Sequence, residues 1–454
     1  MAIFWRAVCS SRNILTALCC RRRALPIYFL VFIAAVWSTV WMQKSQETLT
    51  KDDVNEKKVS TLKVIRYGEG HPRLALYSAH ERTLDGAMVV TVVGLVDRDN
   101  VQFTQVTCRF SVEKEKLGSG NDTSYWDTQG KVLVLPEHHS QRYGAALIDC
   151  PILLERPRPN LVSIVVNVTD PYLYSAQITY LDTGEPKRQL ALCMPPIHSG
   201  YNNWKELVET LELQQLLGVD RADVYAHNTG PNVTSVLNYY VTRGFLHVHE
   251  WPDPPQPVHY FGQLAAINDC LLRMRNVAKL VLFTDLDEVI VPHRHDSLSD
   301  MLQDVLKGQQ DPDHVGAFNF LNSFFVPSND SEAQSRLLQN STLNSDQIRL
   351  ARSLGLKAVS GVYHGKVFPF TERSKCIVDP LTVTMMQVHF VGIFSKGFRS
   401  VTVDPSISLL HHYRGREDRE NLVPETSALK FAPELIRRVH SLGKAVGFLE
   451  HSNS

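Results

Sequence analysis

The chain has 454 residues, of which 44% are hydrophobic and 21% charged, with 47 basic (Lys and Arg) and 47 acidic (Asp and Glu) residues. This composition is typical of globular proteins and excludes collagen-like, disordered and coiled-coil classes. The balance hides an asymmetry, because residues 1–42 carry five arginines and no acidic residue. Removing those five leaves 42 basic residues against 47 acidic ones. This mildly acidic remainder argues against a nucleic-acid partner.

An uncharged stretch near the N-terminus covers residues 24–42, with the sequence ALPIYFLVFIAAVWSTVWM. As a helix it would rise about 28 Å, roughly the hydrocarbon thickness of a bilayer. Arg21–Arg23 precede it, and positive charge stays on the cytosolic side. The pattern predicts a transmembrane signal anchor that follows a cytosolic tail, residues 1–23. A cleaved signal peptide fits less well, because the stretch is long for an h-region and no small-x-small cleavage site follows.

The chain beyond the anchor is predicted to be lumenal. Residues 43–60 are polar without an apolar period, which is typical of a stem. Five N-x-Ser/Thr sequons follow at Asn121, Asn167, Asn232, Asn329 and Asn340. The cysteines beyond the anchor are Cys108, Cys150, Cys193, Cys270 and Cys376, an odd number that allows at most two disulfides.

The sequence pattern of residues 61–186 is typical of a β-rich domain. Runs rich in β-branched residues, such as 88–96 and 101–110, are separated by turn residues. We expect a small antiparallel sandwich in which Cys108 and Cys150 lie on neighbouring strands and form a disulfide. This region shows no recognisable catalytic constellation.

Residues 187–454 change to an alternation of strands and helices. Short apolar strands at 189–194 and 280–284, with amphipathic helices between them, predict a doubly wound α/β domain with a parallel sheet. In such sheets, ligands bind at the carboxyl ends of the strands. Cys193 ends the first strand and Cys270 lies on the helix before the second, so we expect them to pair and leave Cys376 free.

Acidic residues directly follow the apolar strand 280–284, in the order Asp285-Leu286-Asp287-Glu288. In an extended segment Asp285 and Asp287 point the same way, so both can meet one ion. Carboxylate and diphosphate oxygens together suit Mn²⁺ or Mg²⁺. Acidic residues at strand ends are also commonly helix caps or solvated loop residues. Because the apolar strand places this pair at the edge of the sheet where ligands bind, we favour a metal site over those two roles.

Several spaced motifs resemble glycosyltransferase family 92. They are Tyr260–Gln263, Asn268–Cys270 and Phe283–Glu288, with further matches at 192–196, 375–380, 389 and 412–414. The resemblance covers roughly residues 190–415. It implies a GT-A fold after a small β-rich domain, in a single-pass type II Golgi membrane protein. It also implies inverting β1,4-galactosyl transfer from UDP-galactose, with a divalent metal, onto a terminal β-galactose or fucose of glycoprotein N-glycans.

The resemblance further implies roles for single residues. Asp287, and Asp285 directly or through water, would hold the metal that bridges the donor diphosphate, with His412 and then His389 as candidates for a further ligand. Glu288 is grouped with Asp287 as catalytic. Lys375, or Arg373 beside it, would pair with a phosphate. The general base stays open between Glu372 and Asp379, neither of which stands out.

Two other functions are compatible with parts of this sequence. An apolar strand followed by D-x-D also matches haloacid-dehalogenase-type phosphatases, with Asp285 as nucleophile and Asp287 as acid/base. That motif normally ends the first strand of its domain, whereas about ninety residues of α/β pattern precede it here. The third alternative is a carbohydrate-binding pseudoenzyme with an intact fold.

Overall fold

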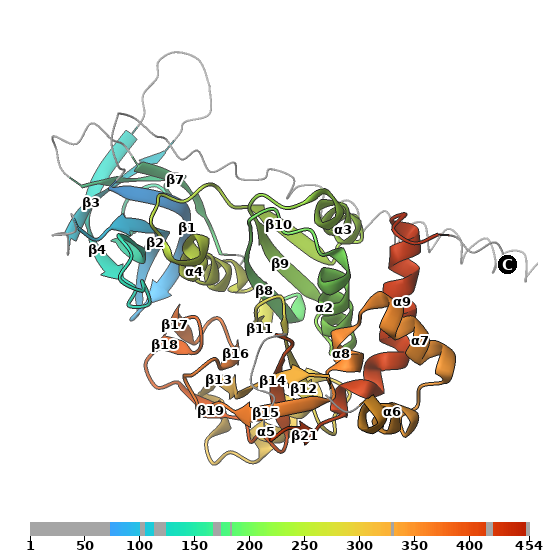
Figure 1. Cartoon of the computed structure of the whole chain (residues 1–454). Coiled ribbons are helices and arrows are strands. Elements are labelled where there is room, and N and C mark those ends of the chain that lie inside the picture. The colour runs from blue at the N-terminus through green and yellow to red at the C-terminus, as the bar shows by residue number, and fades with distance from the viewer. Residues whose placement is uncertain are drawn as a thin grey trace, which may run out of the picture. The chain divides into compact units, whose positions relative to one another are not determined.

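The computed structural model describes residues 73–99, 105–112, 124–166, 174–181, 184–327, 331–414 and 421–450 (Figure 1). The chain divides into two compact units, Met1–Ser60 and Thr61–Ser454, and every described residue lies in the second. The predicted cytosolic tail, membrane anchor and stem lie outside the described residues. Within the described part of the chain, no helix is long and apolar enough to span a membrane.

The N-terminal strands form a closed barrel in the order β1-β2-β5-β4-β3-β6-β7. Their bounds are β1 Leu74–Leu84, β2 Ala87–Asp97, β3 Gln105–Val112, β4 Ser124–Val134, β5 Tyr143–Pro151, β6 Leu161–Val165 and β7 Tyr174–Thr179. The predicted sandwich is therefore wrong. A short parallel pairing of β1 with β7 closes the sheet, which leaves no open edge. Local periodicity predicts strands but not which distant strands pair.

The barrel encloses the predicted Cys108–Cys150 disulfide. The two cysteines do not lie on neighbouring strands, because β4 runs between β3 and β5. Gly130 of β4 pairs with Val106 of β3, and a Cβ atom on it would meet the Cys108 sulfur at 2.4 Å. A glycine at this position thus lets the bridge pass over the intervening strand.

The α/β part contains a seven-stranded sheet in the order β10-β9-β8-β11-β16-β13-β19. Its strands are β8 Arg188–Ile197, β9 Arg221–Ala226, β10 Leu246–Glu250, β11 Ala278–Phe283, β13 Val315–Phe320, β16 Lys375–Val378 and β19 Arg399–Thr402. The first four along the chain pair in parallel, as predicted. Strand β16 is antiparallel to β11 and β13, so the sheet is mixed. A short apolar run such as β16 does not encode its own direction.

Side-chain alternation along β8 divides the core between the two faces of this sheet. Leu190 and Leu192 pack toward α2 (Trp204–Leu216) and α3 (Pro231–Thr242). Ala191 and Cys193 pack toward α4 (Gln263–Met274), and Cys193 forms the predicted disulfide with Cys270 on that helix. Successive residues of a strand point to opposite faces, which is why one strand serves both cores. The predicted free Cys376 is unpaired and buried.

A second sheet of five strands follows, in the order β12-β20-β14-β15-β21. Its strands are β12 Glu288–Pro292, β14 Asn322–Val326, β15 Tyr363–Val367, β20 Ser408–His412 and β21 Val423–Pro424, and a separate hairpin joins β17 Val383–Met386 to β18 Val391–Phe394. The remaining helices are α5 Leu298–Lys307, α6 Ser331–Gln339, α7 Ser345–Leu354, α8 Lys357–Ser360 and α9 Ala432–Ala445, with short 3₁₀ turns at His259–Gly262, Pro312–His314 and Ser427–Phe431.

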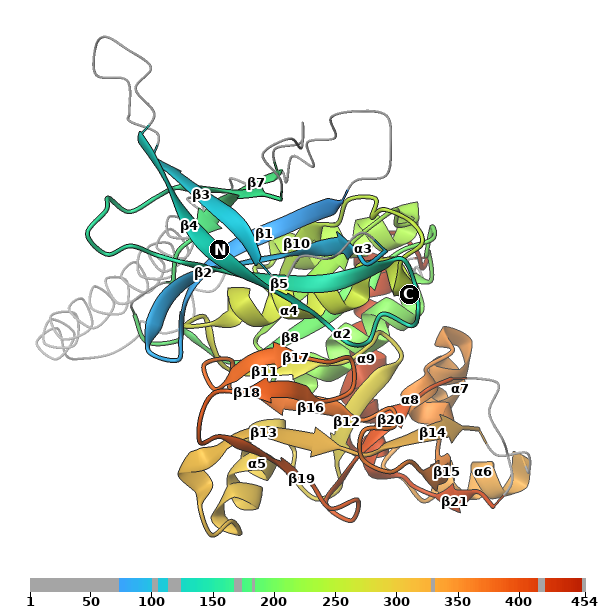
Figure 2. The same cartoon turned by 90° about the vertical axis from the view of Figure 1, so that its left-hand side faces the viewer.

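Helix α4 lies between the barrel strands β1 and β2 and the sheet strand β8 (Figures 1 and 2). One hydrophobic cluster joins Tyr77 and Leu95 of the barrel to Leu264 and Leu271 of the helix. The barrel and the α/β part therefore share a core. The predicted division into domains at 61–186 and 187–454 stays a prediction, since both belong to one compact unit.

Candidate active site

The acidic motif lies in the turn from β11 to β12, at the carboxyl end of the parallel strands. It opens onto a pocket of about 580 Å³. The pocket is lined by Asp285, Asp287, Glu288, His389 and His412, so the fold brings together five of the predicted site residues. Parallel strands β8 and β11 end beside one another, which is where an α/β sheet binds ligands.

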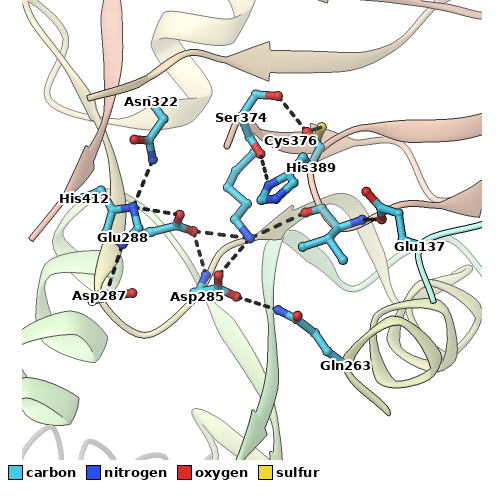
Figure 3. Close-up of polar contacts among 12 residues, drawn as sticks. Glu137, Gln263, Asp285, Asp287, Glu288, Asn322, Ser374, Cys376, His389 and His412 are labelled. Atoms are coloured by element: carbon cyan, nitrogen blue, oxygen red, sulfur yellow. Dashed lines mark hydrogen bonds and ion pairs between the residues drawn. The ribbon is translucent and has the colours of Figure 1, made fainter. Parts of the chain in front are cut away.

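Asp287 directly precedes β12, and His412 ends β20, the strand that pairs with β12 in the second sheet. Strand β12 pairs with β20, and the Asp287 carbonyl accepts a hydrogen bond from the Tyr413 N–H at 2.9 Å. This register places His412 Nε2 3.2 Å from Asp287 Oδ2 (Figure 3). Burial alone would raise the pKa of Asp287, but the hydrogen bond and charge of His412 outweigh it and lower that pKa. Asp287 is therefore a carboxylate at neutral pH.

The donor set of this pair fits a divalent metal. A carboxylate oxygen and an imidazole nitrogen face the same pocket, and both are ligand types that Mn²⁺ accepts. Among the described residues, no three His, Cys, Asp or Glu side chains are grouped as a ready metal site. A metal bound here would thus have Asp287 and His412 as protein ligands and take its other ligands from substrate or water.

Asp285 is engaged by the protein itself. Its Oδ2 accepts a hydrogen bond from Lys375 Nζ at 3.0 Å, and its Oδ1 accepts one from Gln263 Nε2 at 3.1 Å. The backbone N–H of Asp285 donates to Glu288 Oε2 at 3.0 Å. These bonds fix the conformation of the turn. Because both carboxylate oxygens of Asp285 are already engaged, they favour a water-mediated contact with a metal over a direct one.

Lys375 is 2% exposed and does not line the pocket. Its ammonium lies between Asp285 and Glu288, 3.4 Å from Glu288 Oε2. Burial would lower the pKa of Lys375, but the two carboxylates outweigh it and raise that pKa; burial raises the pKa of Glu288 to about 7 despite the charge of Lys375. The predicted contact of Lys375 with a phosphate has no support in this geometry, because its charge is already compensated inside the protein.

Arg373, the other predicted phosphate contact, does line the pocket. Among the described residues that line the pocket, the arginine and lysine side chains are Arg373 and Arg414. The Arg373 guanidinium lies over the rings of Phe324 and Phe368, 5.3 and 5.5 Å from their centroids, and the Phe324 ring contacts His412. The cationic side of the pocket is thus the side of His412.

His389 lines the pocket, but Figure 3 shows it apart from Asp287, whereas His412 lies beside Asp287. Its Nδ1 lies 3.3 Å from the Ser374 carbonyl. Burial and the charge of Lys375 lower the pKa of His389 to about 4, so it is a neutral imidazole. This placement favours His412 over His389 as the metal ligand. The two weak candidates for the base, Glu372 and Asp379, are not among the lining residues.

Sequence reasoning missed part of the pocket. Two lining residues, Glu137 and His139, come from the barrel region, whose sequence shows no catalytic pattern. Others are His198, Tyr201, Glu206, His259 and Arg414. The run Glu137-His138-His139 between two strands is a local signal, but nothing in the sequence shows that it faces the acidic motif.

Comparison with known proteins decides the family. The family model described as "Glycosyltransferase family 92" matches residues 188–441, more than half of the chain. The chain belongs to glycosyltransferase family 92. This membership confirms the resemblance read from the motifs. It argues against the phosphatase alternative, as does the position of the acidic motif after the fourth strand of its sheet.

Curated relatives of this family 92 chain come from Caenorhabditis elegans. "Beta-1,4-galactosyltransferase galt-1" is 22% identical over 308 residues, which cover 65% of this chain and 65% of that protein. "Glycosyltransferase family 92 protein C33H5.2" is 22% identical and covers 49% of this chain and 41% of that protein. The match therefore spans less than two thirds of the length of these relatives.

Among solved structures, the family 92 chain is similar to glucosyl-3-phosphoglycerate synthase from Mycobacterium tuberculosis in complex with Mn²⁺, UDP and glucosyl-3-phosphoglycerate. The similarity covers 59% of this chain and 82% of that chain, at 13% identity and a TM-score of 0.26. A likeness this weak does not define the fold, so the α/β assignment rests on strand order and pairing.

Proposed function

We propose that this protein is a metal-dependent, inverting glycosyltransferase that transfers galactose from UDP-galactose in β1,4 linkage to a terminal β-galactose or fucose of N-glycans. The observation that carries the proposal is the pair of Asp287 and His412 in a pocket that also holds Arg373 and Arg414. Family membership and the name of the galt-1 relative support the donor and the linkage.

The pocket residues have separate roles in this proposal. Asp287 and His412 would hold Mn²⁺ or Mg²⁺, which when bound supplies Lewis-acid stabilisation of the charge on the departing diphosphate. Arg373 and Arg414 would pair with phosphate oxygens through their guanidinium groups. Lys375 and Gln263 keep Asp285, and with it the turn, in one conformation. The acceptor hydroxyl attacks the anomeric carbon as the bond to the diphosphate breaks, and its proton passes to a base.

The test uses the full chain in detergent with UDP-galactose, an N-glycan glycopeptide, and either Mn²⁺ or a chelator. We expect transfer only with metal, and proton NMR should show a β-linkage. Asp287→Asn keeps the size of the side chain and should lower turnover by about 10²–10³-fold, as when one group that stabilises transition-state charge is lost. His412→Ala should lower activity in a way that added Mn²⁺ partly restores.

The exposed Asp346→Asn is the matched control and should retain normal turnover. An α-linked product, or near-normal transfer by Asp287→Asn, would contradict the mechanism. Binding of UDP-galactose without turnover under every condition would instead point to the pseudoenzyme alternative.

We also infer that the protein is anchored in the Golgi membrane by residues 24–42, with its catalytic part in the lumen. Support comes from that uncharged stretch and from two disulfides, which persist in oxidising compartments. Protease treatment of intact Golgi vesicles should spare a C-terminal tag. Loss of the tag without detergent, or complete resistance of the protein to endoglycosidases, would contradict this topology.

A further inference from the structure

The barrel forms part of the active-site pocket. The segment between β4 and β5 places Glu137 and His139 in the pocket wall, beside residues that follow more than a hundred positions later in the chain. Figure 3 shows Glu137 at the opposite end of the drawn site from Asp287. The segment between β4 and β5 thus forms the pocket wall that lies away from the proposed metal ligands.

This segment is fixed to the α/β part by several contacts. Glu137 Oε2 accepts a hydrogen bond from the N–H of Val388, next to His389, at 2.6 Å. The His139 ring stacks on His259 with centroids 3.7 Å apart. At the end of the segment, the Tyr143 N–H donates to the Pro257 carbonyl at 3.1 Å. Glu137 and His139 therefore hold defined positions in the wall.

The charge of this end differs from that of the metal end. Arg373 packs over Phe324 beside His412, and Arg414 follows His412 by two residues. The described lining residues from the barrel and from the 259–260 turn are a carboxylate, two imidazoles and a phenol, with no lysine or arginine among them. A carboxylate repels a diphosphate and accepts hydrogen bonds from neutral hydroxyl groups. This end suits an uncharged sugar.

An unusual backbone conformation adds an aromatic surface there. Tyr260, Phe261 and Gly262 have φ values of 39°, 54° and 79°, a left-handed run that aromatic residues rarely adopt. Trp251 Nε1 donates to the Phe261 carbonyl at 2.7 Å and holds the run in place. Tyr260 remains 56% exposed and lines the pocket next to His259. Such strain is typical of functional sites.

We propose that Glu137 and His139 of the barrel, together with His259 and Tyr260, form the acceptor-sugar subsite. The inference rests on the proposed function and assigns the barrel a share in acceptor recognition. Glu137 accepts a hydrogen bond from an acceptor hydroxyl, and the rings of His139 and Tyr260 cover a face of the sugar. The donor diphosphate lies at the other end, with Arg373 and Arg414.

The experiment measures donor and acceptor KM separately for the full chain, with UDP-galactose and an N-glycan glycopeptide ending in β-galactose. The variants are Glu137→Gln, His139→Ala and Tyr260→Ala. Glu137→Gln keeps a side-chain oxygen for the Val388 N–H, so the wall is retained while the charge is lost. We expect the acceptor KM to rise at least tenfold and the donor KM to change less than twofold.

Two exposed barrel residues outside the pocket provide matched controls, Glu155→Gln and Tyr125→Ala. Both should keep the two KM values of the unmodified protein. An unchanged acceptor KM in all three pocket variants, or an equal rise in donor KM, overturns the inference while the unmodified protein still transfers galactose. If the unmodified protein neither transfers galactose nor hydrolyses UDP-galactose, the proposed function fails and this inference fails with it.

Discussion

Lys375 shows how one buried residue supports the acidic motif. Its ammonium is the shared partner of Asp285 and Glu288, two carboxylates that would otherwise repel each other in a largely buried place. The pairing fixes Asp285 and, through the Asp285 N–H bond to Glu288, the backbone of the turn. Asp287 then faces His412 from a preformed loop.

We predict that Lys375→Met strongly destabilises the protein. The change leaves the buried Glu288 and the partly exposed Asp285 without their cation, and breaking a buried pair costs about 3–5 kcal/mol of unfolding free energy. Urea denaturation of the fragment 61–454 measures the loss, with the exposed Lys396→Met as control. Adding Glu288→Gln to Lys375→Met should recover part of the stability. A loss as small as that of the control would contradict the assigned role.

At the scale of elements, Asp269 joins three parts of the fold. The carboxylate is 1% exposed on α4 and accepts hydrogen bonds from Ser78 Oγ of β1, from Tyr225 OH of β9 at 2.6 Å and from Arg273 at 2.6 Å. His80 Nε2 of β1 lies 2.8 Å away. Helix α4 is thereby tied to the barrel as well as to the sheet.

Asp269→Asn should lower the unfolding free energy by about 3–5 kcal/mol, because it leaves the Arg273 charge without its buried partner. Burial would raise the pKa of Asp269, yet Arg273 and His80 hold that pKa well below its usual range, so the wild-type group is charged. Denaturation curves of Asp269→Asn and of the exposed Asp253→Asn should differ clearly. Coincident curves would show that the network contributes little.

A second link between elements depends on pH. His293 follows β12, and its Nε2 lies 2.8 Å from Oε2 of Glu425, which follows β21. The pairing raises the pKa of His293 above its ordinary 6.5. Burial would raise the pKa of Glu425, but His293 and the Ser427 N–H lower it from 4.5 to about 2. Both groups are therefore charged in the folded protein between about pH 4.5 and 6.5.

The pair should stabilise the fold fully in that window. Its contribution falls as pH rises through the raised pKa of His293, and as pH drops toward 2 where Glu425 is protonated. We expect His293→Gln to lose about 1–3 kcal/mol of unfolding free energy at pH 5.5 and clearly less at pH 8.5. Denaturation at the two pH values measures this, and an equal loss at both would contradict the pairing.

At the scale of the whole molecule, the barrel and the α/β part depend on each other. Tyr77 of the barrel stacks on Trp251 with centroids 4.0 Å apart, and Leu95 and Leu147 pack in the same cluster as Ile267. Separating the barrel from the α/β part would expose this apolar surface to water. The cost is about 25 cal/mol of free energy for each Å² exposed.

We therefore predict that residues 187–454 do not fold alone. The fragment should aggregate and lack a cooperative thermal transition, whereas the fragment 61–454 should unfold cooperatively. Calorimetry and size-exclusion chromatography compare the two. A monomeric fragment 187–454 with a sharp transition would show that the α/β part is an independent domain.

The sequence by itself determined the features that depend on local pattern. Apolar runs and helical periodicity located the strands and helices from 189 to 284, and the acidic motif followed a buried strand as expected. Both disulfides were predicted correctly, and Cys376 is free as expected. The strands, helices and acidic motif are readable because each is carried by residues close together in the chain. The disulfides are readable because few alternative pairings exist.

Only the tertiary structure decided how distant segments meet. Closure of the barrel requires β1 to pair with β7, and β16 must enter the first sheet antiparallel to its neighbours. Burial of Lys375 depends on where β11 and β16 lie relative to each other, so the sequence could not distinguish its role from that of Arg373. The entry of Glu137 into the pocket depends on contacts of the segment between β4 and β5 with Val388 and His259, which lie far from it in the chain. Local periodicity carries no record of such long-range pairings, because they are fixed by the sum of many contacts between segments far apart in the chain.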